Sequence, residues 1–206
     1  MRADFSRRSF LRGSALTTAG ATLLNNTAAL AAEAQTENSP LASSLASLGP
    51  DVVPITLHIN GTTVTIRAEP RMTLAEALRG PLGLTGTKIA CNRGACSACT
   101  VWLDRQPVCA CMILAIDVGR RAITTIEGLV HGDELHAVQQ AFIDHDALQC
   151  GFCTPGMIMS CAALLEHTAE PTADNVRVAI SGHYCRCGTY PHVIEATLAA
   201  AKAHKA

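Results

Sequence analysis

Aromatic side chains and long apolar runs are scarce in this 206-residue chain. Phe, Trp and Tyr make up only 3% of it, so any core must be built mainly from Ala, Val, Ile and Leu. A membrane-spanning helix needs about 20 consecutive apolar residues, and no such run is present. The formal net charge is −1, with neither a basic patch nor an acidic block. We therefore expect no membrane span and no nucleic-acid partner.

Sequence motifs of common catalytic sites are also absent. The chain has no P-loop, no Gly-x-Gly-x-x-Gly motif and no nucleophile elbow. Its eight histidines are scattered, and we interpret His183 and His192 as packing or surface groups. The sequence therefore offers no catalytic residue.

The first 31 residues are typical of a targeting segment, which is not part of the fold. The sequence Ser-Arg-Arg-Ser-Phe-Leu-Arg at 6–12 is a twin-arginine pattern, and a weakly apolar stretch and an Ala-Leu-Ala cleavage site at 29–31 follow it. A Sec signal or a short membrane anchor is the alternative. The tight Arg-Arg-x-Phe-Leu spacing favours twin-arginine export of the folded protein to the periplasm. Residues 32–52, rich in Ala, Ser and Asn, are interpreted as a linker.

Ten cysteines are the main feature that is present, and eight of them form two sets of four. The members of the first set are Cys91, Cys96, Cys99 and Cys111. The members of the second set are Cys150, Cys153, Cys185 and Cys187. Cys-x4-Cys-x2-Cys with a fourth cysteine downstream is the plant-type spacing of a [2Fe–2S] cluster, which binds four thiolates. The sequence therefore predicts two [2Fe–2S] clusters in one chain, and hence electron relay.

Other uses of these cysteines fit less well. Exported proteins usually oxidise their cysteines to disulfides, but the twin-arginine route carries proteins already folded with their cofactors, so cluster ligation would protect the thiolates. Zinc sites usually take two Cys-x2-Cys pairs, which the first set does not contain. A thioredoxin-like Cys-x-x-Cys would need a βαβ context, and the second set is in a helical one. Cys161 and Cys109 are interpreted as small buried residues, although Cys109 could compete with Cys111 as a ligand.

Residues 53–128 have the pattern of a small mixed sheet. Apolar residues alternate on both sides of Asn60-Gly61, which predicts a hairpin with a primed turn. Thr73 is expected to cap a short helix that ends at Leu78. A Gly- and Cys-rich loop at 83–99 lies between this helix and expected strands at 100–103 and 123–126. This order predicts a β-grasp, plant-type ferredoxin-like domain.

Residues 129–206 have a helical pattern instead. We expect four helices there: 135–143, 154–167, one capped by Thr172 that ends before Gly182, and one from Pro191 to the C-terminus. Thr154 is expected to cap the second of them, and its positive end to favour the thiolate form at the Cys150–Cys153 pair. The expected fold class is α+β, with the sheet domain followed by a four-helix [2Fe–2S]-binding bundle in which the two cysteine pairs meet at one end.

Three motifs together resemble a known family. They are Cys-x4-Cys-x2-Cys-Thr-Val, the sequence Gln-Cys-Gly-Phe-Cys-Thr-Pro-Gly at 149–156, and Cys185-Arg186-Cys187. The chain resembles the small iron–sulfur subunit of the molybdenum hydroxylases, the xanthine oxidase family, over about residues 53–200. With the export signal, it is most similar to the small subunit of a periplasmic aldehyde oxidoreductase.

The resemblance implies partners, cofactors and a route for electrons. It implies a heterotrimer with an FAD-binding subunit and a large subunit that carries molybdenum on molybdopterin cytosine dinucleotide. Electrons from aldehyde oxidation would pass through the two clusters to FAD, with the Cys150 set nearer molybdenum and the Cys91 set nearer FAD. Gln149 would hydrogen-bond the pterin. The alternatives are the small subunit of another molybdenum hydroxylase, of the N-heterocycle or xanthine type, or a stand-alone ferredoxin-like carrier.

Two positions depart from the family pattern without removing a ligand. The family usually has Gly where this chain has Ser97; the backbone N–H of Ser97 is still available to a cluster, but a positive φ there would cost more. The family commonly reads Cys-Arg-Cys-Thr-Gly-Tyr, whereas here Cys187 is followed by Gly188-Thr189-Tyr190.

Overall fold

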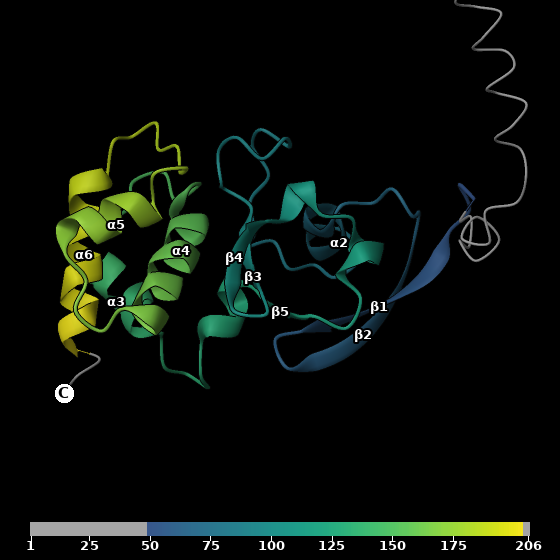
Figure 1. Ribbon diagram of the computed structural model, residues 1–206, viewed down its shortest axis with the longest axis horizontal. Helices are drawn as coiled ribbons and strands as arrows, with labels where there is room; N and C mark the ends of the chain where they lie inside the picture. Colours follow the sequence, from purple (N-terminus) through teal and green to yellow (C-terminus); the bar gives the residue numbers. More distant parts are fainter. Residues whose placement is uncertain (1–48, 204–206) are drawn as a thin grey trace, which may run out of the picture. The chain divides into compact units, whose positions relative to one another are not determined.

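The computed structural model describes residues 49–203 (Figure 1). The predicted targeting segment at 1–31, and all but the last four residues of the predicted linker at 32–52, lie outside the described residues. In the part of the chain that is described, no helix is long and apolar enough to cross a membrane.

The predicted hairpin is present and opens the sheet. Strands β1 (Val53–Ile59) and β2 (Thr62–Ala68) pair antiparallel, with Ile59 opposite Thr62. Asn60 and Gly61 both have positive φ, 49° and 77°, which is the primed turn that matches the twist of the strands. Alternate residues of β1 are buried, so the hairpin has one face toward a core.

The sheet has five strands in the order β2-β1-β5-β3-β4. The added strands are β3 (Thr100–Leu103), β4 (Gln106–Cys109) and β5 (Ala122–Thr124). β5 pairs parallel with β1 and antiparallel with β3. Sequence analysis expected β3 and β5 but not the edge strand β4. Helix α2 (Leu74–Arg79) packs its apolar side into the same core as β1 and begins with a capping box in which Thr73 and Glu76 bond each other's backbone N–H.

Short 3-10 helices connect the later elements. η1 (Ala110–Met112) and η2 (Ala115–Val118) lie between β4 and β5, and η3 (Ile126–Leu129) lies between β5 and the helical region. η1 follows β4 directly and buries Cys111, at 5% exposure, in the same core as β1 and α2. This turn is what brings the last cysteine of the first set back toward the loop at 91–99.

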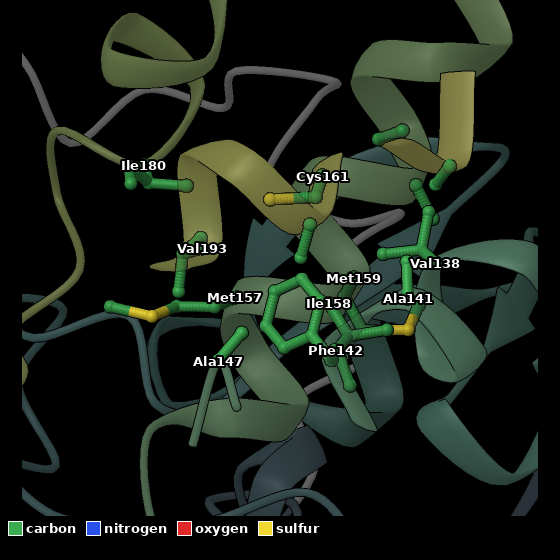
Figure 2. Packing of buried hydrophobic residues seen from close by; sticks show 14 of the residues in the cluster. Val138, Ala141, Phe142, Ala147, Met157, Ile158, Met159, Cys161, Ile180 and Val193 are labelled. Atoms are coloured by element: carbon green, nitrogen blue, oxygen red, sulfur yellow. The ribbon is translucent and has the colours of Figure 1, made fainter. Parts of the chain in front are cut away.

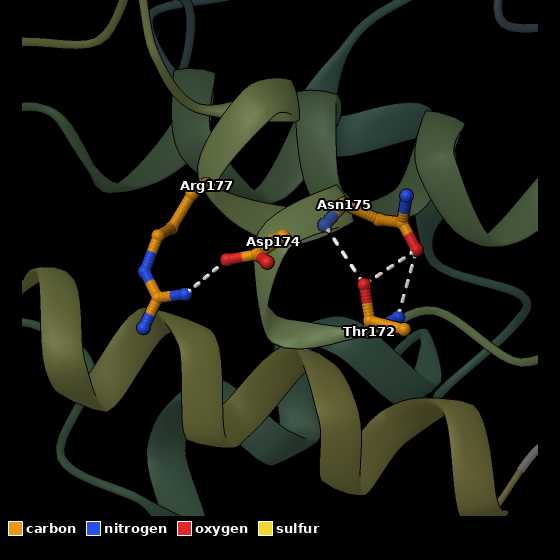
Figure 3. Close-up of polar contacts among 4 residues, drawn as sticks. All are labelled: Thr172, Asp174, Asn175 and Arg177. Carbon is orange, nitrogen blue, oxygen red and sulfur yellow. Dashed lines mark hydrogen bonds and ion pairs between the residues drawn. The ribbon is translucent and has the colours of Figure 1, made fainter.

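The four helices expected after residue 128 are all present. They are α3 (Ala137–Asp144), α4 (Thr154–His167), α5 (Ala173–Ala179) and α6 (Tyr190–Ala203). Their apolar sides form a second core, with the ring of Phe142 among its fully buried members (Figure 2). Thr172 caps α5 through a reciprocal bond with Asn175, as expected, and Asp174 pairs with Arg177 on the same helix (Figure 3). The expected cap of α4 was wrong by one residue, because Cys153 is the N-cap and Thr154 the first helical residue.

The only tryptophan of the chain links the sheet to the second core. Trp102 lies in β3 but packs with the residues of the helical core, and its indole Nε1–H donates to the carbonyl oxygen of Met159 at 2.8 Å. Arg105, at the turn after β3, forms an ion pair with Glu166 of α4. The α+β class is therefore confirmed, with a mixed sheet and several helices in contact through β3 and α4.

Candidate metal centres

The loop that carries the first three cysteines coils tightly because three of its residues have positive φ. These are Asn92 at 49°, Gly94 at 70° and Ser97 at 54°. A side chain at Gly94 would place its Cβ 2.8 Å from Cγ of Met112, so that position needs glycine for space as well as for φ. Ser97 adopts the strained conformation that the sequence comparison with the family pattern anticipated.

Backbone amides of this region point at the sulfurs of the first set. The N–H of Ala95 donates to Sγ of Cys91 at 3.3 Å, and the N–H of Gly94 donates to Sγ of Cys111 at 3.2 Å. The N–H of Cys111 donates in turn to Sγ of Cys99 at 3.5 Å. Donors to ligand sulfurs are what an iron–sulfur site needs to stabilise its negative charge.

The thiols of the first set lie together in pairs. Cys91 is in side-chain contact with Cys96, and Cys99 with Cys111. The backbone N–H of Arg93, followed by the Cys96 side chain, lowers the pKa of Cys91 to about 7, which favours the thiolate that binds metal. The structure thus places the four cysteines predicted for this set as two contacting pairs, Cys91 with Cys96 and Cys99 with Cys111.

Cys109 lies close to the same group and stays the open alternative. Its Sγ is 3.8 Å from Oγ of Ser97. A hydrogen bond from Cys99 lowers the pKa of Cys109 to about 6, and the same bond raises the pKa of Cys99. Cys111, however, is the one whose sulfur accepts the amide of the loop glycine at 94. This bond favours Cys111 as the fourth member.

The second set is assembled from two segments that are far apart in the sequence. Cys150 and Cys153 precede α4, whereas Cys185 and Cys187 precede α6. The thiol of Cys153 is in contact with that of Cys185, and the thiol of Cys150 with that of Cys187. The expectation that the two pairs meet agrees with these contacts.

Burial dominates the protonation of Cys153, an effect that sequence analysis did not include. Burial raises the pKa of Cys153 to about 12, so the positive end of α4 does not by itself produce a thiolate there. Burial also tends to raise the pKa of Cys185, but hydrogen bonds from the side chain and backbone of Thr189, together with those from the Cys153 thiol and the Cys187 backbone, outweigh it and lower that pKa to about 7. A bound iron would have to supply the charge that stabilises the Cys153 thiolate.

Side chains fix the second Cys-x-Cys loop, and sequence analysis missed them. The hydroxyl of Tyr190 accepts from the N–H of Cys185 at 2.8 Å and donates to the carbonyl oxygen of His183 at 3.0 Å. Oγ1 of Thr189 lies 3.3 Å from Sγ of Cys185. The imidazole of His183 is buried and bonds Oγ of Ser160 through Nε2 at 2.7 Å, and burial lowers its pKa to about 4. The Gly-Thr-Tyr sequence after Cys187 was the available signal for these roles.

The two cysteine loops touch each other. The N–H of Tyr184 donates to the carbonyl oxygen of Cys96 at 3.3 Å. A Cβ on Gly156 would lie 2.4 Å from the carbonyl oxygen of Ser97, and one on Gly182 would lie 3.2 Å from Oγ of the same serine. Tyr184 directly precedes Cys185 of the second set. A single hydrogen bond therefore joins Cys96 of the first set to the residue next to Cys185.

Cys161 is buried, and Gln149, the expected pterin contact, is exposed. Cys161 is fully buried in the helical core, and burial raises its pKa to about 12 (Figure 2). Gln149 is exposed, between the exposed residues Leu148 and Cys150.

The cysteines of both sets are arranged as contacting pairs of thiols. Among residues 49–203, no three Cys, His, Asp or Glu side chains are arranged as ligands of one metal ion. The repeating unit is instead a pair of thiols, which is what each iron of a [2Fe–2S] cluster takes from the protein. With the amides aimed at its sulfurs, the first set fits such a cluster, and the pairing of the second set fits another.

Comparison with known proteins agrees with this chemistry. The family of [2Fe–2S] binding domains matches residues 125–198. The iron–sulfur-binding subunit PaoA of an aldehyde oxidoreductase from Escherichia coli O157:H7 is 38% identical over 94% of this chain and 86% of its own length. The small subunit of nicotine 6-hydroxylase from Paenarthrobacter nicotinovorans is 44% identical over 72% of this chain and 89% of its own.

Solved structures show the same relationship. Quinoline 2-oxidoreductase from Pseudomonas putida 86 has a chain that superposes with a TM-score of 0.72 at 43% identity, covering 75% of this chain and 97% of that one. The aldehyde oxidoreductase of Desulfovibrio desulfuricans superposes with a TM-score of 0.70 at 40% identity, covering 74% of this chain and 17% of that longer one. The chain therefore belongs to the small [2Fe–2S] iron–sulfur subunits of the molybdenum hydroxylase family.

Proposed function

We propose that this chain is the electron-transfer subunit of a molybdenum-containing aldehyde oxidoreductase. In this proposal a large subunit holds molybdenum on molybdopterin cytosine dinucleotide, another subunit holds FAD, and the chain passes electrons from the first to the second within a heterotrimer. The similarity to PaoA supports the aldehyde class because it extends over 94% of this chain.

The observation that carries the proposal is the contact between the two cysteine loops. Cys91, Cys96, Cys99 and Cys111 would hold one [2Fe–2S] cluster, and Cys150, Cys153, Cys185 and Cys187 the other. Each cluster, when bound, would accept and release one electron. The hydrogen bond from the N–H of Tyr184 to the carbonyl oxygen of Cys96, 3.3 Å long, joins the two ligand loops. The glycine at 156 lets the start of α4 approach the first loop. These contacts would hold the two sites close to each other.

Two separate cores support a division into two cluster-carrying domains. One core is built from residues of the sheet strands and α2, and the other from residues of η3 and the four helices. We propose domain limits of 53–128 and 129–206, with β-grasp and four-helix architecture respectively, and Trp102 as the side chain that joins them. Gln149 is proposed to contact the pterin from its exposed position beside Cys150, and the backbone N–H of Ser97 to face the first cluster.

Export in the folded state belongs to the same proposal. The twin-arginine pattern at 6–12 supports transport to the periplasm after the clusters are inserted. Replacement of Arg7 and Arg8 by Lys should leave folded, cluster-loaded protein in the cytoplasm. Normal export of that double variant would contradict the proposed route.

Oxidation of an N-heterocycle is the second candidate reaction of the complex. Relatives named for nicotine and quinoline match this chain at 44% and 43% identity, so identity alone does not select a substrate. The test is to purify the chain with its partner subunits and follow cluster absorbance after adding an aldehyde, a purine or a pyridine. We expect rapid bleaching with aldehydes. Bleaching with the heterocycles alone would assign the second reaction, and bleaching with none would contradict both.

A further inference from the structure

The hydroxyl of Thr189 is placed against one ligand of the second set. Its Oγ1 lies 3.3 Å from Sγ of Cys185, and the residue is only 2% exposed. An iron-bound thiolate carries no proton, so in that contact the hydroxyl must be the donor and the sulfur the acceptor. Burial keeps water from replacing the bond.

Neighbouring residues shape the loop that carries Cys185 and Thr189. The side chain of Tyr190 bonds the backbone on both sides of Tyr184, accepting from Cys185 and donating to His183. Gly188 has a φ of 78°, a conformation that a threonine there would adopt only with strain. The order Gly188-Thr189 therefore suits this loop: the glycine makes the turn, and the threonine that follows it reaches back to the sulfur.

We propose that Thr189 is a positioning residue that raises the reduction potential of the second cluster through its hydrogen bond to Cys185. The proposal rests on the proposed function, in which Cys185 is an iron ligand. Reduction adds one negative charge to the cluster, and part of this charge resides on the ligand sulfurs. A donor at the sulfur stabilises the reduced form more than the oxidised form, so its removal lowers the potential.

The chain offers a graded set of variants for the test. Thr189→Val has nearly the same shape and lacks the hydroxyl, whereas Thr189→Ser keeps it. Thr197→Val is the matched control, because Thr197 is also buried, within α6, but its hydroxyl donates to the carbonyl oxygen of Val193 at 2.7 Å. The purified complex of each variant is titrated with reductant, and the two cluster signals are followed by EPR.

We expect Thr189→Val to lower the potential of one cluster and leave the other unchanged. The ratio of reduced to oxidised cluster at a fixed applied potential should fall about twofold to tenfold, the size expected for one hydrogen bond. Thr189→Ser and Thr197→Val should titrate as wild type. An unchanged titration of Thr189→Val, or an equal shift in Thr197→Val, would overturn the proposal.

Two further outcomes would contradict a tuning role of the Thr189 hydroxyl or the ligand assignment of Cys185. If Thr189→Val does not assemble, Thr189→Ala removes the same hydroxyl without added bulk. Failure of both variants to load iron, with Thr189→Ser intact, would assign the hydroxyl to folding of the loop and contradict a tuning role. A wild-type complex with a single EPR signal would instead refute the ligand assignment of Cys185 itself, which is a failure of the proposed function.

Discussion

The two cysteine sets solve the same chemical problem with different parts of the chain. In the first set three cysteines lie within nine residues, and the donors aimed at the sulfurs are backbone amides of Gly94, Ala95 and Cys111. In the second set two separate segments meet at the starts of α4 and α6, and side chains of Thr189 and Tyr190 bond the ligand residue.

This difference determines which substitutions each site should tolerate. A backbone amide survives most side-chain changes, so the first site should be sensitive mainly to backbone conformation and to loss of a ligand. A side-chain donor is lost in one substitution, so the second site should be adjustable without disassembly. Side-chain substitutions should therefore change the reduction potential of the first cluster little. Loss of a donor side chain should change the potential of the second cluster.

The largest effect is expected when Cys111, the last cysteine of the first set, is replaced. Cys111→Ser should lose or distort one of the two EPR signals, because the sulfur that accepts the Gly94 amide is gone. Cys109→Ser is the matched control, because the thiol of Cys109 also contacts that of Cys99 but should be dispensable. Loss of the signal in Cys109→Ser, with Cys111→Ser unaffected, would reverse the ligand assignment.

A smaller effect is expected where the two sites touch. In Gly156→Ala the new Cβ would lie 2.4 Å from the carbonyl oxygen of Ser97, so α4 or the first loop must shift. Such overpacking costs about 1–3 kcal/mol of unfolding free energy, or several degrees in melting temperature by calorimetry. Gly182→Ala, with a Cβ 3.2 Å from a serine hydroxyl that can rotate, should cost clearly less. Equal melting temperatures for the two variants would mean that the close approach of the loops is not rigid.

The smallest effect is expected at the exposed edge of the second set. Gln149→Ala removes a proposed hydrogen bond to the pterin, about 0.5–1.5 kcal/mol, so substrate-dependent reduction should slow roughly threefold to tenfold. Both clusters should stay in place, since Gln149 bonds no cysteine sulfur in the described structure. Stopped-flow spectra separate cluster reduction from flavin reduction. If only flavin reduction slows, the proposed order of the two clusters is reversed.

Much of the fold was predictable because its signals are local. Asn60-Gly61 between alternating strands, and the capping residues Thr73 and Thr172, each act within a few residues, and the structure has all of them. The edge strand β4 was missed because Gln106-Pro107 has no strand pattern of its own and pairs only through its register with β3. The cap of α4 was misplaced by one residue, since Cys153 takes that position without a side-chain hydrogen bond.

Long-range contacts were the part of the site that sequence could not predict. The cysteine spacing indicated both sets, but not that Cys153 lies with Cys185 or that Tyr184 bonds Cys96. For the same reason, sequence analysis considered the start of α4 at the Cys150–Cys153 pair but not the burial that raises the pKa of Cys153. Helix position is local and visible in sequence, whereas burial depends on the packing of distant elements and here has the larger effect.

The metal content of the purified complex directly tests whether the chain binds two [2Fe–2S] clusters. Eight cysteine ligands arranged as two sets should hold two [2Fe–2S] clusters, hence about four irons and four sulfides per chain, with two distinct EPR signals after reduction. Zinc in stoichiometric amount without iron, or two irons with a single signal, would contradict the account of two clusters held in contact by one small chain.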